Sequence, residues 1–412
     1  GEEYSRALFF LSPFILLFSV SLFQVLNLTL FQGDKYQTIA ESNRIYQKPI
    51  SPVRGFIYDR NGTLLAENIV QRDLYVTPAY IEDSAETILK LSNLLDVPYE
   101  LLDENFSRGV KKVKKFDSFP LVKALNEEQI AKAKVNLDSI SGIEVKATLK
   151  RYVLHEETLA HVLGYVGDIS SDDIRRDKLL AELQNTQIGK TGIEKEFDYV
   201  LRGKPGIQTQ ERDVKGKLVR TLDTQGAEDG KDIYLTIDQK LQDHLFKLFE
   251  NRRGALVALE PKTGLVRALI SSPSFNPNIL NSIVDTDEVE SLFSNKESPI
   301  FNRAISGQYP PASTLKPFVG LAAIENEVIS WDKTIKDDGE FYVEGDPRPY
   351  RGWKENGHGR VDMRKAIAES SDVYFYNIAF DLTLAGIRPM LDSFGFGKKT
   401  GLTDFEANGL LP

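Results

Sequence analysis

Apolar residues dominate the beginning of the chain. Residues 7–32 carry no charged side chain and are rich in Phe and Leu. At about 1.5 Å per residue, a helix of this length exceeds the roughly 30 Å hydrocarbon core of a bilayer. The run is longer than the apolar part of a signal peptide, and no Ala-x-Ala site ends it. We therefore expect one transmembrane anchor over 7–32, a cytoplasmic tail over 1–6 and a body outside the membrane. A buried core helix is the alternative.

Residues 33–228 mix strand and helix patterns. Two alternating apolar runs flank Asn61-Gly62, which is a strong hairpin signal. The other elements expected in this region are a strand over 73–77, helices over 85–95 and 126–134, a strand-rich stretch over 142–167 and a helix over 194–201. This mixture predicts an α+β domain.

A second domain is expected over residues 229–412. The Gly- and acid-rich segment 226–230 marks the boundary. Beyond it the patterns predict a strand over 232–237, an amphipathic helix over 239–252 and two apolar strands over 254–260 and 265–271, joined by a tight turn. A hairpin with helices on either side predicts another α+β domain, with helices packed on an antiparallel sheet.

Composition narrows the class of protein. The hydrophobic content of 41% and charged content of 27% are typical of a globular chain. The net charge of -9 argues against nucleic acid as a partner. The absence of cysteine excludes disulfides, thiolate catalysis and Cys-ligated zinc.

The string YPPASTLKP at 309–317 combines a hydroxyl and an amine three residues apart. On a helix these positions share a face, so Ser313 Oγ and Lys316 Nζ are expected to meet. Pro317 fits a helix only in its first turn, so the helix must begin close to Ser313. Ser313 would then lie beside free amides able to hold an oxyanion.

Ser-x-x-Lys alone is a weak pattern, and the chain holds a second copy. Ser330 and Lys333 are followed by a charged, loop-like run. By contrast, the apolar run 318–324 after Lys316 reads as a buried helix. The first copy is therefore the candidate for catalysis.

The sequence Ser370-Ser371-Asp372 follows a predicted helix over 363–368. By itself this triplet is typical of a helix cap or a turn. Together with Ser313 and Lys316, however, it resembles the Ser-x-x-Lys and Ser-x-Asn motifs of the penicillin-recognising serine acyl transferases.

Other motifs extend this resemblance along the chain. They are RGFIYDRNG at 54–62, HVLGYVG at 161–167, GIEKEF at 192–197, GALVALEPKTG at 254–264 and WKENGHGR at 353–360. As a set they resemble class B penicillin-binding proteins, and the elongation-type branch, penicillin-binding protein 2, in particular. The resemblance implies a single transmembrane helix, an elongated α+β pedestal of the dimerisation type over 33–228 and a transpeptidase domain from 229.

The resemblance also implies a function. It is peptidoglycan D,D-transpeptidation on the periplasmic side of the bacterial inner membrane during cell elongation, without cofactor or metal. Ser313 would attack the D-Ala-D-Ala amide of a stem peptide, Lys316 would act as the general base, and Ser370 would relay a proton to the leaving amine. A free lysine pKa of about 10.4 is too high for this role, so burial and a nearby cation are expected to lower it. β-Lactams would acylate the same serine, and the implied partners are a SEDS-family glycosyltransferase and elongation-complex proteins.

Two departures from the family pattern affect these expectations. Asp372 stands where Asn is commoner, so a donor is replaced by a carboxylate that either contacts substrate differently or pairs with Lys316. The family's third motif, Lys-Thr-Gly on a strand facing the serine, is not found in its place. The triplets at 190–192, 262–264 and 399–401 are interpreted as chance matches to this motif. We expect the transpeptidase domain to be incomplete, the native protein to continue past 412, and residues 1–412 alone to be inactive.

Alternatives to catalysis remain open. None of the four histidines lies in a metal-ligand pattern. We expect a structural or loop role for His358, since zinc there would need carboxylates such as Asp337, Asp338 or Asp362. The competing function is a non-catalytic scaffold whose pedestal activates the SEDS polymerase. A β-lactam sensor is disfavoured by the single predicted span, and a secreted β-lactamase by the anchor and the pedestal.

Overall fold

The computed structural model describes residues 18, 20–22, 45–111, 113, 115–136, 140–178, 180, 183, 187–213, 218–250, 252–280 and 286–411. The predicted tail and nearly all of the predicted anchor lie outside these residues. Within the described ranges, no helix combines the length and apolarity needed to cross a membrane. By their internal contacts the residues form two units, the first comprising Gly1–Glu156, Leu163–Leu235 and Asn276–Val289, the second Glu157–Val162, Thr236–Phe275 and Glu290–Pro412.

A mixed five-stranded sheet organises the first unit. Its strands are β2 (Ile57–Tyr58), β3 (Leu64–Val76), β4 (Phe119–Val122), β5 (Ile143–Val153) and β10 (Ile233–Tyr234), with β10-β2-β3-β4 in order and β5 also on β3. The predicted hairpin is confirmed between β2 and β3. Asp59 accepts the amides of Asn61 at 2.7 Å and Thr63 at 2.8 Å, and Gly62 supplies a positive φ of 82°.

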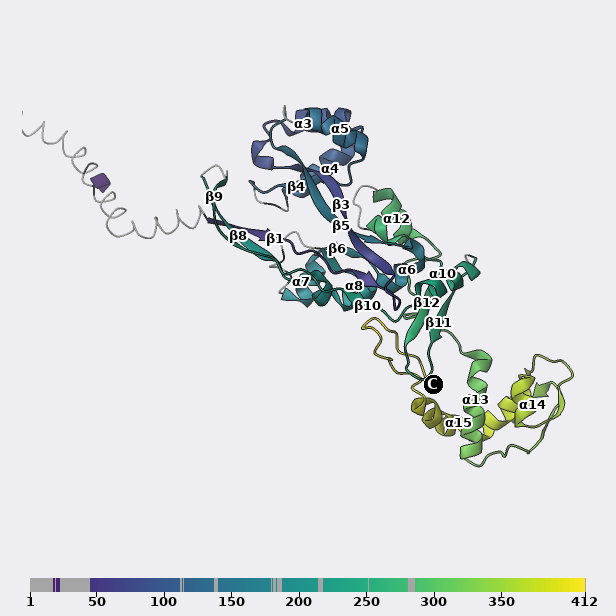
Figure 1. Ribbon diagram of the computed structural model, residues 1–412. Helices are drawn as coiled ribbons and strands as arrows, with labels where there is room; N and C mark the ends of the chain where they lie inside the picture. Colours follow the sequence, from purple (N-terminus) through teal and green to yellow (C-terminus); the bar gives the residue numbers. More distant parts are fainter. Residues whose placement is uncertain are drawn as a thin grey trace, which may run out of the picture. The chain divides into compact units, whose positions relative to one another are not determined.

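Three helices gather at one end of the long β3–β5 pair (Figure 1). They are α3 (Ser84–Leu95), α4 (Tyr99–Val110) and α5 (Glu127–Asn136), and they confirm the helices predicted over 85–95 and 126–134. Their apolar faces cover a core with fully or nearly fully buried members, including Leu74, Ile88, Leu91, Leu102 and Leu121. Burial of this apolar surface is what holds the helices on the sheet.

The prediction of a strand-rich stretch over 142–167 is wrong in its middle. Between β5 and β6 (Val166–Asp168) lies a helix, α6 (Glu156–Leu163). Leu159, Ala160 and Leu163 are buried there, at helical rather than alternating spacing. The helix expected over 194–201 is two short ones, α8 (Gly192–Glu196) and α9 (Asp198–Arg202), which meet at Phe197.

The remaining elements of the first unit lie outside the main sheet. A separate three-stranded antiparallel sheet has the order β1 (Ile45–Ile50), β8 (Gly206–Arg212), β9 (Leu218–Gln225), and β6 pairs with β7 (Gln187–Gly189). A 3₁₀ turn at Pro78–Tyr80, α7 (Ser171–Arg176) and α11 (Pro277–Leu280) complete the unit, and α12 (Thr286–Ser294) spans its last boundary.

A buried ion-pair cluster joins distant parts of this unit. The Glu194 side chain is fully buried and accepts the Nε–H groups of Arg54 and Arg151, each at 2.6 Å. Arg54 also contacts Asp198 at 2.9 Å. Burial lowers the pKa of Arg151, and the contact with Glu194 opposes that shift. The family-like motifs at 54–62 and 192–197 thus contact each other through this cluster.

In the second unit, β11 (Gly254–Leu259) and β12 (Val266–Ser272) form the predicted antiparallel hairpin. The preceding helix, α10 (Gln239–Leu248), is shorter than expected but packs on β12. Its fully buried Gln242 donates to the Leu269 carbonyl at 2.7 Å and accepts the Leu269 amide at 2.9 Å. This amide pair fixes the helix along the strand.

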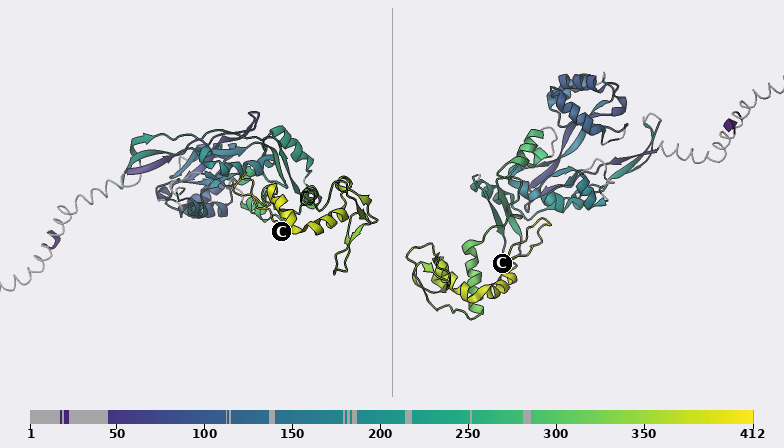
Figure 2. Two further views of the ribbon diagram at one scale, coloured as in Figure 1. Left: turned by 90° about the horizontal axis from the view of Figure 1, so that it is seen from below. Right: turned by 180° about the vertical axis from the view of Figure 1, so that it is seen from behind.

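Helices form the other core of the second unit. A 3₁₀ turn at Ala312–Leu315 leads into α13 (Lys316–Glu325), and α14 (Met363–Ala368) precedes α15 (Asp372–Ser393), which breaks at Thr383. Their shared core includes Ala322, Ala323, Met363, Tyr374 and Ile378, so these helices stay together in both views of Figure 2. Two small hairpins lie between α13 and α14, β13 (Ile335–Asp337) with β16 (Gly359–Val361) and β14 (Glu340–Phe341) with β15 (Tyr350–Arg351).

The buried ion-pair cluster generates a stability prediction. Glu194→Gln removes the negative charge between two guanidinium groups, so we expect a loss of about 3–5 kcal/mol in unfolding free energy. The matched control is Glu86→Gln, which breaks an exposed i,i+4 pair with Lys90 and should cost less than about 0.5 kcal/mol. Denaturant unfolding measures both, and equal effects would contradict a structural role for the cluster.

Candidate active site

Ser313 lies where the sequence predicts, at the entrance to a helix. It belongs to the 3₁₀ turn Ala312–Leu315, and α13 begins at Lys316 with Pro317 in its first turn. Ala312, which precedes the serine, has a positive φ of 49°. The turn therefore presents the hydroxyl immediately before the helix, as the constraint at Pro317 requires.

Lys316 joins this turn to the start of α15. Its Nζ donates to the Ser370 carbonyl at 2.9 Å, to Ser370 Oγ at 3.1 Å and to Asp372 Oδ1 at 2.6 Å. Ser370 Oγ in turn donates to Ser313 Oγ at 3.1 Å. Among the described residues, the hydrogen bonds thus connect Lys316 to Ser313 through Ser370, where the sequence suggested a direct contact.

The four predicted site residues, Ser313, Lys316, Ser370 and Asp372, are therefore brought together. The side chains of Lys316 and Asp372 are 13% and 25% exposed, so their ion pair is only partly screened by water. The carboxylate pairs with the lysine, one of the two possibilities that the sequence left open. The charged group found beside Lys316 is this carboxylate, where a cation was expected.

Ser370 has an unusual backbone. Its φ is 53°, a left-handed conformation that is costly for a residue with a Cβ. The next residue, Ser371, is fully buried and caps α15 by accepting the Tyr374 amide at 3.2 Å. The left-handed residue thus links the end of α14 to the cap of α15 and turns its hydroxyl towards Ser313.

A buried carboxylate supports this link. Asp337 Oδ2 accepts the Ser371 hydroxyl and His358 Nδ1–H, both at 2.7 Å, and Asp337 Oδ1 accepts the Gly339 amide at 2.9 Å. Burial alone would raise the pKa of Asp337, but these hydrogen bonds outweigh it and hold that pKa below its ordinary value. His358, expected to have a structural or loop role, is one of three donors to this carboxylate.

The other carboxylates considered for zinc point elsewhere. Asp338 pairs with Lys336 at 2.8 Å, and Asp362 caps α14 through the Lys365 amide at 2.8 Å. In the part of the chain that the structure describes, no three His, Cys, Asp or Glu side chains are grouped as metal ligands.

Trp353 closes the other side of Asp372. Its backbone amide donates to Asp372 Oδ2 at 3.1 Å, and its indole N–H donates to the Glu369 carbonyl at 3.1 Å. Its ring meets that of His358 edge to face, with centroids 5.3 Å apart. The indole is 64% exposed, so it forms part of the surface next to the serines.

None of the three Lys-Thr-Gly triplets lies in a strand. Lys190 pairs with Asp173 in the first unit, and residues 262–264 form the turn between β11 and β12. In the segment 399–401, Lys399 donates to the Asp404 carbonyl at 3.0 Å, and Thr400 and the Gly401 amide bind Glu406. These local contacts agree with the interpretation of the triplets as chance matches to the motif.

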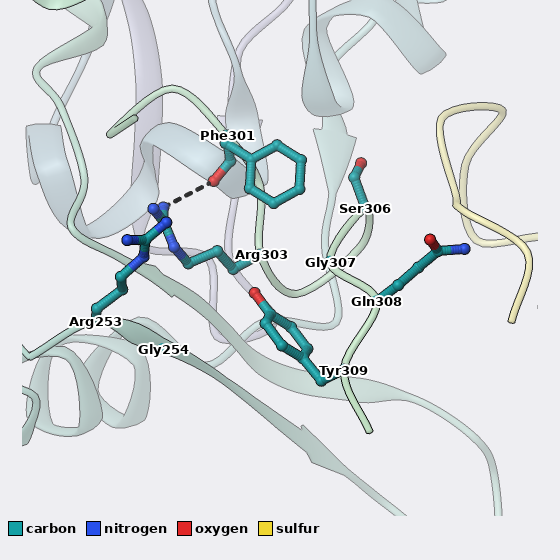
Figure 3. Close-up of a pocket in the computed structure, with 8 residues that line it drawn as sticks. All are labelled: Arg253, Gly254, Phe301, Arg303, Ser306, Gly307, Gln308 and Tyr309. Carbon is teal, nitrogen blue, oxygen red and sulfur yellow. Dashed lines mark hydrogen bonds between the residues drawn. The ribbon is translucent and has the colours of Figure 1, made fainter. Parts of the chain in front are cut away.

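A pocket of about 530 Å³ lies on the segment that leads to the serine turn (Figure 3). Arg253 and Arg303 direct their guanidinium groups towards each other beside Tyr309. Burial lowers the pKa of Arg303, and the like charge of Arg253 adds to the shift. Arg303 donates to the Ser298 carbonyl at 3.0 Å and to the Phe301 carbonyl at 3.3 Å, so it braces its own loop.

Similarity to known proteins agrees with this geometry. Residues 49–235 match the model of the penicillin-binding protein dimerisation domain, and residues 254–411 match that of the penicillin-binding protein transpeptidase domain. A solved penicillin-binding protein (PBP2) from Helicobacter pylori is 30% identical, and the match covers 89% of this chain and 69% of that one, with a TM-score of 0.72. The chain belongs to the penicillin-binding protein family.

Curated relatives point to one branch of this family. The peptidoglycan D,D-transpeptidase MrdA of Haemophilus influenzae is 37% identical over 392 residues, which cover 94% of this chain and 60% of the relative. MrdA of Escherichia coli K12 is 36% identical over 404 residues, covering 96% and 63%. The chain therefore spans about three fifths of the length of these relatives.

A further solved structure, the complex between PBP2 and MreC from Helicobacter pylori, matches with a TM-score of 0.78 and 29% identity. The match covers 89% of this chain and 69% of that one.

Sequence reasoning about this penicillin-binding protein missed the support behind the site. The sequence presents Ser371 only as part of a motif and Asp337 only as a possible zinc partner. The available signal was Gly357 in the Gly-His-Gly string at 357–359, because a glycine beside a histidine can mark a close backbone approach.

This close approach generates a prediction at Gly357, whose φ is 66° and whose added Cβ would lie 2.0 Å from the Asp337 carbonyl oxygen. The matched control is Gly345, with a φ of 87° and nothing within 4 Å of an added Cβ. Left-handed strain should cost both alanine variants about 1–2 kcal/mol. The clash should cost Gly357→Ala about 1–3 kcal/mol more in denaturant unfolding. Equal losses would show that the loop relaxes away from Asp337.

Proposed function

We propose that the full-length protein is a peptidoglycan D,D-transpeptidase that works through an acyl-enzyme on Ser313 during cell elongation. The observation that carries this proposal is the continuous hydrogen-bond chain from Lys316 through Ser370 to Ser313. A hydroxyl becomes a useful nucleophile when a base can take its proton, and this chain provides the path. The names of the curated relatives support the same reaction.

Acylation transfers one proton and exchanges one bond. Ser313 Oγ attacks the carbonyl carbon of the D-Ala-D-Ala amide, and its proton passes through the Ser370 hydroxyl to Lys316 Nζ, a step that requires the neutral amine. The C–N bond then breaks, the proton returns through Ser370 to the leaving nitrogen, and D-Ala departs. In the structure Lys316 donates to Ser370 and Ser370 donates to Ser313, each at 3.1 Å. For the transfer both hydrogen bonds reverse, so that Ser313 donates to Ser370 and Ser370 to the amine. Rotation of the two hydroxyl groups achieves this without a movement of heavy atoms.

Asp372 holds the lysine in place for both steps. The carboxylate lies 2.6 Å from Lys316 Nζ and is itself fixed by the Trp353 amide at 3.1 Å. The flexible lysine side chain is thereby kept in one rotamer beside Ser370. The base then loses no further conformational entropy during the reaction. Ser313, Lys316 and Ser370 act on the substrate, and Asp372 positions the base.

The second half-reaction uses the same groups in reverse order. The side-chain amine of a neighbouring stem peptide attacks the acyl carbon and gives its proton to the relay. The Ser313 ester bond breaks, the crosslink forms, and the relay returns the proton to Ser313 Oγ. A β-lactam would open on Ser313 in the same way but would leave no departing group to make room for the amine.

The proposal extends to location and partners. The uncharged run over 7–32 supports a single-pass anchor in the bacterial inner membrane with the two domains on the periplasmic side. We propose a SEDS-family glycosyltransferase and elongation-complex proteins as partners. A protein of the MreC type is among the latter, because a similar PBP2 has been solved as a complex with MreC.

The first test is covalent labelling of the full-length protein with a fluorescent penicillin. We expect Ser313→Ala to abolish labelling, because the acylated oxygen is removed. The control, Ser330→Ala, changes the serine of the second Ser-x-x-Lys string and should label like the wild type. Labelling that survives in Ser313→Ala would overturn the assignment of the nucleophile.

A second test concerns the base. Lys316→Ala should lower the acylation rate by about 10²–10⁴-fold, the usual effect of removing a general base. Lys333→Ala is the matched control and should leave the rate unchanged. Stopped-flow or quenched labelling gives both rates, and a loss below about tenfold would argue against proton transfer to Lys316.

A folded wild-type protein that is not labelled at all would favour the other class of function. In that case the chain would serve as a non-catalytic scaffold whose pedestal activates the SEDS polymerase, and glycan polymerisation by the partner would depend on the pedestal alone.

A further inference from the structure

The geometry points to Asp337, His358 and Ser371 as a positioning triad for Ser370, and we propose that its hydrogen bonds set the rate of acylation. This inference deepens the proposed function and rests on it. The triad touches none of the reacting atoms named above, so its residues act through Ser370 and are positioning residues.

The backbone of Ser370 is strained. A left-handed φ of 53° places the Ser370 carbonyl and hydroxyl on Lys316 and directs that hydroxyl to Ser313. A non-glycine residue relaxes out of this conformation unless its surroundings hold it there. Relaxation would break the relay, because the carbonyl and the hydroxyl contact Lys316 together.

Hydrogen bonds on both sides of Ser370 hold the strained residue in place. On its N-terminal side, the Ser370 amide donates to the Ile367 carbonyl at 3.2 Å and the Ser371 amide donates to the Ala366 carbonyl at 2.9 Å. On its C-terminal side, the fully buried Ser371 caps α15 and donates its hydroxyl to Asp337 at 2.7 Å. The Ser371 side chain therefore links the strained residue to a separate hairpin.

Asp337, which accepts the Ser371 hydroxyl, is itself held rigidly. Asp337 is 1% exposed, lies at the end of β13 and pairs with Gly359 of β16. His358, 9% exposed, precedes that partner and donates Nδ1–H to the same oxygen as Ser371. Lys365 of α14 holds the His358 carbonyl at 2.9 Å. The carboxylate is thus fixed from two elements and cannot follow Ser371 if the latter moves.

The test compares two substitutions of similar size at one position in the full-length protein. His358→Leu removes the donor to Asp337, whereas His358→Asn places an amide N–H near the position of Nδ1. Fluorescent-penicillin kinetics separate the binding constant Ks from the first-order acylation constant k2. Because small misplacements of a relay cost about 10–100-fold, His358→Leu should lower k2 by that factor and leave Ks within about threefold. His358→Asn should restore k2 to within about threefold of the wild type.

The control is Arg364→Ala, an exposed position on α14 outside the triad, which should leave k2 and Ks unchanged. Thermal unfolding of each variant shows whether it is folded. If His358→Leu does not fold, Ser371→Ala and its conservative counterpart Ser371→Thr replace the pair, with k2 expected to fall in the first and to be retained in the second.

Three results overturn the inference. The first is a folded donor-less variant with wild-type k2. The second is an equal loss of k2 in the donor-less and conservative variants, and the third is a change confined to Ks. A wild-type protein that is not acylated at Ser313 is a separate outcome, because it removes the proposed function itself.

Discussion

The contacts of Lys316 are the constraint on which the catalytic unit depends. One amine bridges a turn on α13 and a cap on α15, segments 54–56 residues apart, through three hydrogen bonds to Ser370 and Asp372. A lysine that is 13% exposed loses most of its hydration, and only a full set of acceptors compensates for that loss. The same acceptors align Ser370 with Ser313, so the requirement for stability and the requirement for chemistry are met by one arrangement.

Behind this contact, hydrogen bonds connect the partly exposed site to buried side chains. Asp372 is partly exposed, Ser371 is fully buried, and Asp337 is 1% exposed with three donors around it. A buried carboxylate without donors would be unstable, but with three it is a rigid point of attachment. The strained backbone at Ser370 lies between the exposed and buried ends of this series, where a surrounding network can hold it.

The first unit uses charge in a different way. Glu194, Arg54 and Arg151 are separated by up to 140 residues, yet their side chains meet within 2.6 Å in the interior. Their contacts connect α8, β5 and the segment before β2. The motifs that resemble the family's pedestal are therefore explained by folding: removing one charge from such a cluster leaves the others buried without compensation.

Local patterns determined much of this protein. Alternation around Asn61-Gly62, helical spacing over 85–95 and 126–134, and Pro317 after Ser313 predict elements that the structure contains. Each of these signals depends on neighbours only a few residues away. The prediction from residue spacing is wrong over 156–163. The sequence predicts part of a strand-rich stretch there, whereas the structure has a helix that buries one face. The motifs also selected Ser313, Lys316, Ser370 and Asp372 correctly as neighbours in space.

Tertiary structure alone decided how those four groups connect. The path from Lys316 to Ser313 runs through Ser370, and Asp372 binds the lysine, since the crossing of α13 and α15 fixes the distances. The support of Ser371 by Asp337 and His358 depends on a hairpin that brings residues 337 and 358 together. Sequence spacing carries information about contacts along one helix or strand, whereas hydrogen bonds between elements depend on how those elements pack, and packing is a property of the whole core.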